Sequence, residues 1–237
     1  PHAAHVALVR EVSETLQGYA KPSSGVRCVV LTGEGRGFCS GADLSPNSGD
    51  PTMDDPSSAM EKVYNPFMRL LRDYDLPLIA AVNGPAAGIG CSIALACDLV
   101  AAAESSYFLQ AFRRIGLVPD GGATYVLARL VGKARALEMT LLGEKLPARK
   151  ALEWGLINRC VADAELLPTA LDLARTLAEG PKALGLTRQL INRGLDSDLS
   201  SQLDAECDAQ EICRHTADFA EGLAAFREKR PARFTGA

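Results

Sequence analysis

Two glycine-rich loops are the parts of this sequence where chemistry is most readily expected. They are FCSGADL, residues 38–44, and GPAAGIG, residues 84–90, and each follows an apolar run that predicts a buried strand. Glycine permits tight turns and close approach to the backbone, and the start of a helix leaves amides without acceptors. Such amides suit a phosphate, a carboxylate or a developing oxyanion. Close packing of strand against helix is the alternative explanation for these glycines.

Asp120 is the third candidate feature. It stands in GLVPDGGAT, after Pro119 and before two glycines, a pattern typical of a tight turn that leads into a helix. An aspartate in such a turn is often a helix N-cap, which is the simplest interpretation of the pattern alone.

Several other motifs are absent or lack their context. GIGCSI has no third glycine for a dinucleotide-binding loop, no P-loop occurs, and Ser92 is not in a nucleophile elbow. Cys39 and Cys91 adjoin the two loops but have no histidine near them in the sequence. We therefore expect both to be small buried thiols and not nucleophiles.

Alternating strands and helices must position these features. Hydrophobic patterning predicts helices over residues 4–20, 59–73, 88–97, 121–131, 133–142 and 147–153, and strands over 26–33, 76–84, 98–103, 107–110 and 156–161. A polar, proline-rich stretch at 45–58 predicts a mobile loop. From residue 163 to 229 the pattern is helical. The class is therefore α/β, with a core over 1–170 and a helical region over 171–237.

Composition restricts the possible partners. The 237 residues are 47% hydrophobic and 23% charged, and the net charge is −4 with no basic stripe, so we expect no nucleic-acid partner. Prolines and glycines interrupt the longest uncharged stretch, so no membrane span is expected. The seven cysteines show no C-x-x-C spacing and the three histidines no ligand pattern. This indicates reduced, mostly buried thiols, no metal site and a cytoplasmic protein.

Longer segments resemble a known family. GRGFCSGADL, AAVNGPAAGIGCSIALACDLVAAA, IGLVPDGGATYVLARLVG and ALEWGLINRCV are similar to the enoyl-CoA hydratase/isomerase (crotonase) family, as is the ending FAEGLAAFREKRPARFTG. The resemblance runs in order from about residue 4 to the end. Family members usually carry a β-hairpin before the first helix, so we expect that an N-terminal segment precedes residue 1.

The resemblance implies a spiral of ββα units with a helical C-terminal region that assembles trimers or pairs of trimers. The implied partner is an acyl-CoA thioester, with coenzyme A as part of the substrate and no separate cofactor. Matched position by position, the amides of Ala42 and Ile89 would hold the thioester oxygen as an enolate forms. The expected substrate-binding residues are Ser40, Ala42, Asp43, Leu44, Ile89, Gly90 and Phe112.

Two departures from the family decide which reaction is expected. Hydratases of this family use two glutamates, and this chain has Ser92 and Phe112 at the matching positions. Neither is an adequate group for activating water, so an isomerase is expected, with Asp120 as acid and base in apolar surroundings such as Phe112 and Val118 that would raise its pKa. A hydratase with an altered water site remains open. So does a non-catalytic relative that binds acyl-CoA or RNA.

Overall fold

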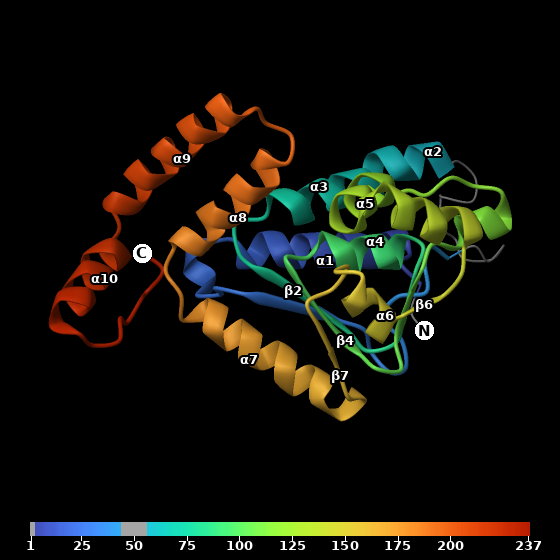
Figure 1. The fold of residues 1–237 in the computed structure, drawn as a ribbon, viewed down its shortest axis with the longest axis horizontal. Coiled ribbons are helices and arrows are strands. Elements are labelled where there is room, and N and C mark those ends of the chain that lie inside the picture. Colours follow the sequence, from blue (N-terminus) through green and yellow to red (C-terminus); the bar gives the residue numbers. More distant parts are fainter. Residues whose placement is uncertain (1–2, 44–55) are drawn as a thin grey trace.

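A four-stranded parallel sheet forms the centre of the fold. The structure is a computed structural model that describes residues 3–43 and 56–237 (Figure 1). The sheet has the order β1–β2–β4–β7. Its strands are β1 (Val29–Thr32), β2 (Leu78–Val82), β4 (Leu99–Ala103) and β7 (Arg159–Val161). Every residue of β2 is buried. This is expected of a central parallel strand, because helices cover both faces of such a sheet.

A second, smaller sheet supports the glycine-rich loops. It contains β3 (Pro85–Ala87), β5 (Tyr107–Leu109) and β6 (Leu146–Pro147), with β3 parallel to β5 and β6 antiparallel to β5. The predicted strand at 107–110 is confirmed. β3 and β6 could not be predicted, because strands of three and two residues are too short to show alternation and both contain proline.

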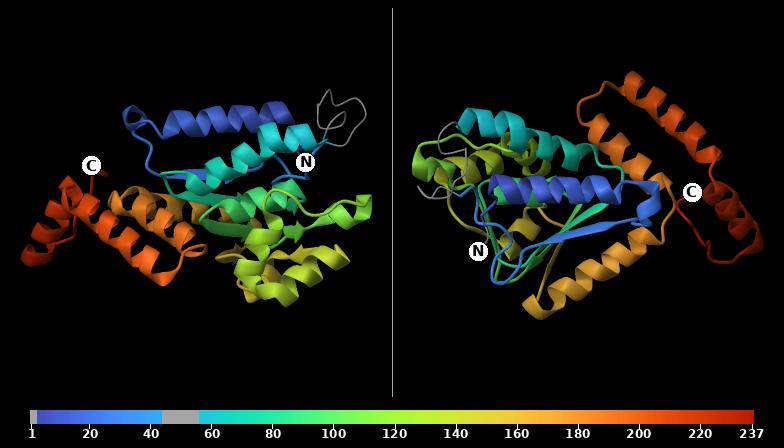
Figure 2. Two further views of the ribbon diagram at one scale, coloured as in Figure 1. Left: turned by 90° about the horizontal axis from the view of Figure 1, so that it is seen from above. Right: turned by 180° about the vertical axis from the view of Figure 1, so that it is seen from behind.

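Helices pack on both faces of the four-stranded sheet. On one face are α1 (Val6–Tyr19), α3 (Asn65–Asp73) and α4 (Ile89–Ala96), whereas α7 (Leu166–Ala178) covers the other (Figure 2). Alternate residues of β2 face opposite ways, so Leu78, Ala80 and Val82 join the larger core, and Ile79 and Ala81 pack with α7. The apolar, uninterrupted sequence of β2 thus serves two cores.

The remaining helices follow the predicted order closely. They are α2 (Pro56–Ala59), α5 (Ala123–Leu142), α6 (Ala148–Glu153), α8 (Ala183–Gly194), α9 (Leu199–Arg214) and α10 (Ala217–Glu228). The predicted helices 121–131 and 133–142 are the two halves of α5, since Gly132 has a left-handed φ of 76° between them. The end of the predicted loop 45–58 is helical instead, and its residues 45–55 lie outside the described residues.

The C-terminal helices α8, α9 and α10 lie beyond the α/β core (Figure 1). The predicted boundary at residue 170 falls inside α7, and Leu166 and Ala170 of that helix are buried against the sheet. The division into a core and a C-terminal assembly region stays a prediction. Among the described residues, no helix has the length and apolarity needed to cross a bilayer.

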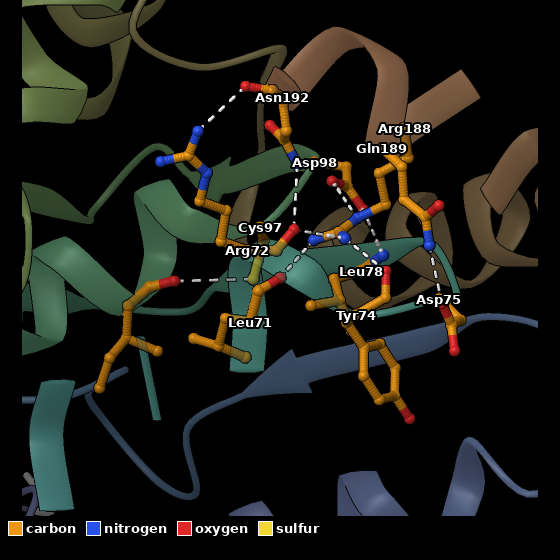
Figure 3. A network of polar contacts seen from close by, with 11 residues as sticks. Leu71, Arg72, Tyr74, Asp75, Leu78, Cys97, Asp98, Arg188, Gln189 and Asn192 are labelled. Atoms are coloured by element: carbon orange, nitrogen blue, oxygen red, sulfur yellow. Dashed lines mark hydrogen bonds and ion pairs between the residues drawn. The ribbon is translucent and has the colours of Figure 1, made fainter. Parts of the chain in front are cut away.

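The buried side chain of Arg188 links α8 to the core through an ion pair and hydrogen bonds. The Arg188 Nε donates to both carboxylate oxygens of Asp98, at 2.6 and 2.8 Å, and its Nη1 donates to the Arg72 carbonyl at 2.7 Å (Figure 3). The same guanidinium also donates to the carbonyls of Leu71 and Tyr74. A single side chain therefore joins α8, the end of α3 and the segment that leads into β4.

Candidate active site

The first glycine-rich loop is held against β3 by main-chain hydrogen bonds. The Cys39 amide donates to the Pro85 carbonyl at 3.0 Å, and the Ala87 amide donates to the Cys39 carbonyl at 2.9 Å. The Gly41 carbonyl accepts from the Ala4 amide at 2.8 Å. These bonds extend the second sheet into the loop. The two glycine-rich loops, which are far apart in the sequence, therefore lie side by side.

The two loops and Phe112 meet around Gly88. A Cβ atom at Gly88 would lie 3.7 Å from the Gly41 Cα and 3.8 Å from the Phe112 Cζ. Gly41 and Gly88 both have positive φ, at 106° and 53°, which side chains rarely tolerate. The backbone conformation, and not the space for a side chain, therefore requires glycine at these two positions. Close packing, the alternative explanation from the sequence, applies at Gly90, where an added Cβ atom would lie 2.5 Å from the Cys39 Cβ.

The amides expected to bind an oxyanion are at this junction. Ile89 is the first residue of α4, after Gly88 as N-cap, and Ala42 follows Gly41. Within the described residues, the hydrogen bonds include no acceptor for the amide of Ile89 or Ala42. The Gly88 amide, in contrast, is used by the Leu109 carbonyl at 2.9 Å. An orphan amide at a helix start has the character required of an oxyanion donor.

Asp120 lies in the turn before α5, and it does not cap that helix with its side chain. The N-cap of α5 is Gly122, and no side chain makes a capping bond there. The Asp120 Oδ1 is buried and has no partner among the described residues. Burial raises the pKa of the Asp120 carboxyl to about 6. The N-cap interpretation from the sequence is therefore wrong, and the carboxylate is free for another use.

The Asp120 turn is packed against the first turn of α4. A Cβ atom at Gly121 would lie 2.2 Å from the Ile89 Cδ1 and 3.0 Å from the Ser92 Cβ. The Ser92 hydroxyl donates to the Asp120 carbonyl at 3.1 Å. The contact between Gly121 and Ile89 therefore brings the residue that carries the free carboxylate, Asp120, close to the residue that carries the orphan amide, Ile89.

The apolar surroundings of Asp120 differ in one respect from the expectation. Phe112, in the 3₁₀ turn Ala111–Ile115, is buried, but Val118 is 81% exposed. The expectation that Val118 forms part of the apolar surroundings of Asp120 is therefore wrong. Its neighbours Leu117 and Ile115 are also more than half exposed, at 56% and 53%.

The predicted substrate-binding residues have different environments. Ser40 is exposed, and Ala42 and Asp43 are partly buried at the end of the first loop. Leu44 lies outside the described residues. Gly90 has its α-carbon against Cys39, since a Cβ atom there would be 2.5 Å from the Cys39 Cβ. Contact of these residues with a substrate stays a prediction.

Sequence reasoning missed one buried polar residue beside this region. Gln110 is fully buried between β5 and the 3₁₀ turn that contains Phe112, and among the described residues its side-chain amide lies against the Cys91 thiol and has no nitrogen or oxygen partner. A lone glutamine after a short strand carries no recognisable motif, so the sequence offered no signal for it.

The cysteines fit the expectation of inert thiols near the loops. Burial raises the pKa of Cys39, and raises that of Cys91 to about 12, so both thiols stay protonated at neutral pH. The expectation that most of the seven are buried is wrong, because only Cys39, Cys91 and Cys97 are buried. The described part of the chain has no cluster of three His, Cys, Asp or Glu side chains suited to a metal ion.

Comparison with known proteins identifies the family. The family model described as enoyl-CoA hydratase/isomerase matches residues 3–237. The chain is 47% identical to 1,2-epoxyphenylacetyl-CoA isomerase of Escherichia coli (strain K12), over 89% of this chain and 82% of the relative. It is 43% identical to a probable enoyl-CoA hydratase of Rhodobacter capsulatus, over 89% and 81% of the two chains.

A solved structure agrees with these sequence matches. Enoyl-CoA hydratase from Bacillus anthracis superposes with a TM-score of 0.92 at 33% identity, covering 99% of this chain and 91% of the other. The match confirms the expected spiral α/β fold with a helical C-terminal region. On these findings, the chain belongs to the enoyl-CoA hydratase/isomerase (crotonase) family.

Proposed function

We propose that this protein is an acyl-CoA thioester isomerase in which Asp120 is the acid and base. The observation that carries the proposal is the single buried carboxylate oxygen of Asp120, which has no partner among the described residues. Ser92 and Phe112 occupy the positions where the family's hydratases have glutamates. One carboxylate can move a proton between two carbons, but it gives little means of activating water.

In the proposed reaction the carboxylate takes a proton from the carbon next to the thioester of a β,γ-unsaturated acyl-CoA. The C–H electrons delocalise onto the thioester oxygen, where the amides of Ala42 and Ile89 stabilise the enolate. Asp120 then returns the proton to the γ-carbon, and the double bond moves into conjugation. Atoms and charge balance without a further cofactor. Donors fixed in advance are most effective here, because the charge on the oxygen develops only in the transition state.

Coenzyme A is proposed to lie along the first loop, at Ser40, Ala42, Asp43 and Leu44. Gly90 and Phe112 would then border the acyl group together with Ile89. The 47% identity to a 1,2-epoxyphenylacetyl-CoA isomerase supports isomerase chemistry and makes the rearrangement of a ring epoxide a second possible form of it. The acyl group itself is not assigned.

A hydratase is the second candidate, and the 43% identity to a probable enoyl-CoA hydratase is the observation in its favour. Two assays separate the candidates. An isomerase should convert a β,γ-unsaturated acyl-CoA to its conjugated isomer, with a rise in conjugated-thioester absorbance. It should leave crotonyl-CoA largely unchanged. Rapid loss of that absorbance from crotonyl-CoA would instead establish the hydratase.

We further propose that the protein assembles as a homotrimer or a dimer of trimers. The C-terminal helices expose large apolar side chains, among them Ile191 at 64%, Leu199 at 75% and Phe226 at 83%. Exposed apolar surface of this kind supports association. Light scattering in solution tests it, and a monomer at micromolar concentration would contradict it.

All seven cysteines are free, which supports a reducing compartment such as the cytoplasm.

Substituting Gly90 with alanine is expected to lower the isomerisation rate about 100-fold, since small displacements at a reacting centre have effects of that order. The new methyl group would lie 2.6 Å from the Cys39 carbonyl oxygen and force the two loops apart. Steady-state kinetics measure the effect. Gly18→Ala in α1 is the matched control, because nothing lies within 4 Å of its added Cβ. An unchanged rate in Gly90→Ala would show that the spacing of the loops is unimportant.

A further inference from the structure

Ser92 has a contact that its place in the family pattern does not explain. It is 2% exposed, and its hydroxyl donates to the main-chain carbonyl of Asp120 at 3.1 Å. Ser92 lies three residues after Ile89, so both side chains are on one face of α4. Ile89 packs against Gly121, and Ser92 is hydrogen-bonded to Asp120, which precedes Gly121.

The Asp120 carbonyl thereby receives hydrogen bonds from two helices. The second donor is the Ala123 amide at 3.1 Å, from the first turn of α5. Two hydrogen bonds to this carbonyl, from two different helices, restrict the main chain at Asp120. The carboxylate is therefore positioned through its backbone.

Positioning through the backbone matters because it leaves the carboxylate oxygen without a donor. A hydrogen bond to a carboxylate stabilises the charged form and weakens it as a base. The Asp120 Oδ1 is buried and has no such partner among the described residues. The placement is thus obtained without the loss of basicity that a direct bond would cause.

The charged side chains on neighbouring elements are engaged elsewhere. Arg113 and Arg114, in the 3₁₀ turn after β5, donate to carbonyls at the end of α5. Arg129 of α5 pairs with Asp196 at 3.1 Å. No ion pair of Asp120 occurs in the part of the chain that the structure describes, and burial alone raises its pKa.

We propose that Ser92 is a positioning residue for the isomerisation, and that its hydroxyl holds the Asp120 main chain so that a donor-free carboxylate faces the substrate. This inference rests on the proposed function, in which Asp120 is the acid and base. Ser92 would then be more than the replacement of a hydratase glutamate. It would support the carboxylate that performs the chemistry.

Three substitutions test the inference. Ser92→Ala removes the hydroxyl, Ser92→Cys keeps nearly the same size with a much weaker donor, and Ser92→Thr retains the hydroxyl. Loss of the bond should lower kcat about 10- to 100-fold with KM nearly unchanged, because a displaced base affects the chemical step more than binding. Ser92→Thr should recover most of kcat.

The pH profile gives a readout that a merely structural role would not move. A loosened turn admits water to Asp120, and better solvation lowers the pKa of its carboxyl. The acid limb of kcat/KM in Ser92→Ala and Ser92→Cys should therefore shift below the value of about 6 that burial gives Asp120. In Ser92→Thr it should stay near the wild-type position.

Ser106→Ala is the matched control. Ser106 is also 2% exposed, and its hydroxyl also donates to a backbone carbonyl, that of Ala103 at 2.7 Å, but it lies in the turn between β4 and β5. We expect it to lower the melting temperature without altering kcat or the acid limb. If folded Ser92→Ala and Ser92→Cys behave in the same way, the positioning role is wrong, although the function of Asp120 stands. If Asp120→Asn keeps more than a tenth of the wild-type activity, the proposed function fails, and the Ser92 role fails with it.

Discussion

Replacing Asp120 with asparagine is expected to lower the isomerisation rate about 1,000-fold, in the middle of the range for removal of a general acid–base group. Asparagine has nearly the same shape, so it preserves the turn and its contacts with Ile89 and Ser92. It cannot accept the proton, and this loss should appear in kcat. Stopped-flow or steady-state assays with a β,γ-unsaturated acyl-CoA measure it. Activity above a tenth of the wild type would contradict the assignment.

The pH dependence of the wild type should show the same group. Asp120 must be ionised to act as a base, so kcat/KM should rise through a pH of about 6 and level off above it. In Asp120→Asn that limb should vanish from the residual activity. A wild-type acid limb near the ordinary aspartate value of 3.8 would mean that the carboxylate is solvated in the working enzyme.

A stability measurement provides the control that Asp120→Asn is folded. The stability that Asp120 contributes should fall as the pH rises, whereas the activity should rise. Burial favours the protonated carboxyl in the folded state. The stability that Asp120 contributes is therefore fully present below a pH of about 3.8, and it is lost as the pH rises through about 6. Asparagine cannot ionise. We expect the variant to be at least as stable as the wild type at pH 8, as measured by urea denaturation.

Replacing Arg188 with alanine is expected to lower the free energy of unfolding by about 3–5 kcal/mol, the usual result of removing one partner of a buried ion pair. The Arg188 side chain is only 5% exposed, and its partner Asp98 is 24% exposed. The variant leaves the Asp98 carboxylate without its cation, and three main-chain carbonyls lose donors (Figure 3). Equilibrium urea denaturation measures the loss.

Arg175→Ala is the control for this prediction. Arg175 and Asp172 form an ion pair on the surface of α7, with side chains 68% and 73% exposed. An exposed pair contributes at most about 1 kcal/mol, because water and salt screen it. If the two variants lose similar stability, the Arg188 network is unimportant for the fold. Asp98 also accepts from the Leu78 amide at 2.7 Å, so some of its charge stays compensated.

Strands and helices that depend on patterns among residues close in the sequence were predicted correctly. The apolar run over 76–84 predicted a buried strand, and β2 lies within it and is buried at every residue. The helical spacing over 4–20 predicted a helix, which is α1. The strands β3 and β6 were not predicted, because pairing stabilises them more than their own two or three residues do. Both pair with β5, and β3 also pairs with the loop at Cys39. Short strands depend on their partners.

The candidate site divides in the same way. Glycine, proline and aspartate reveal turns locally, so both loops and Asp120 could be identified from the sequence. The sequence could not distinguish an N-cap from a free carboxylate, because that depends on whether the Asp120 side chain turns toward the α5 amides. The exposure of Val118 could not be predicted either, because it depends on how the segment before Asp120 crosses the surface.

The sequence by itself determined the order of most strands and helices, which follows from local periodicity. Its motifs also carry the resemblance to the family, and that resemblance implies that Ser92 and Phe112 replace the two hydratase glutamates. Only the tertiary structure decided that Ser92 bonds to the Asp120 carbonyl and that Gly121 packs on Ile89. It likewise decided that Arg188 reaches Asp98, 90 residues away in the chain. Contacts between distant residues depend on how several elements pack together, and no local pattern encodes that packing.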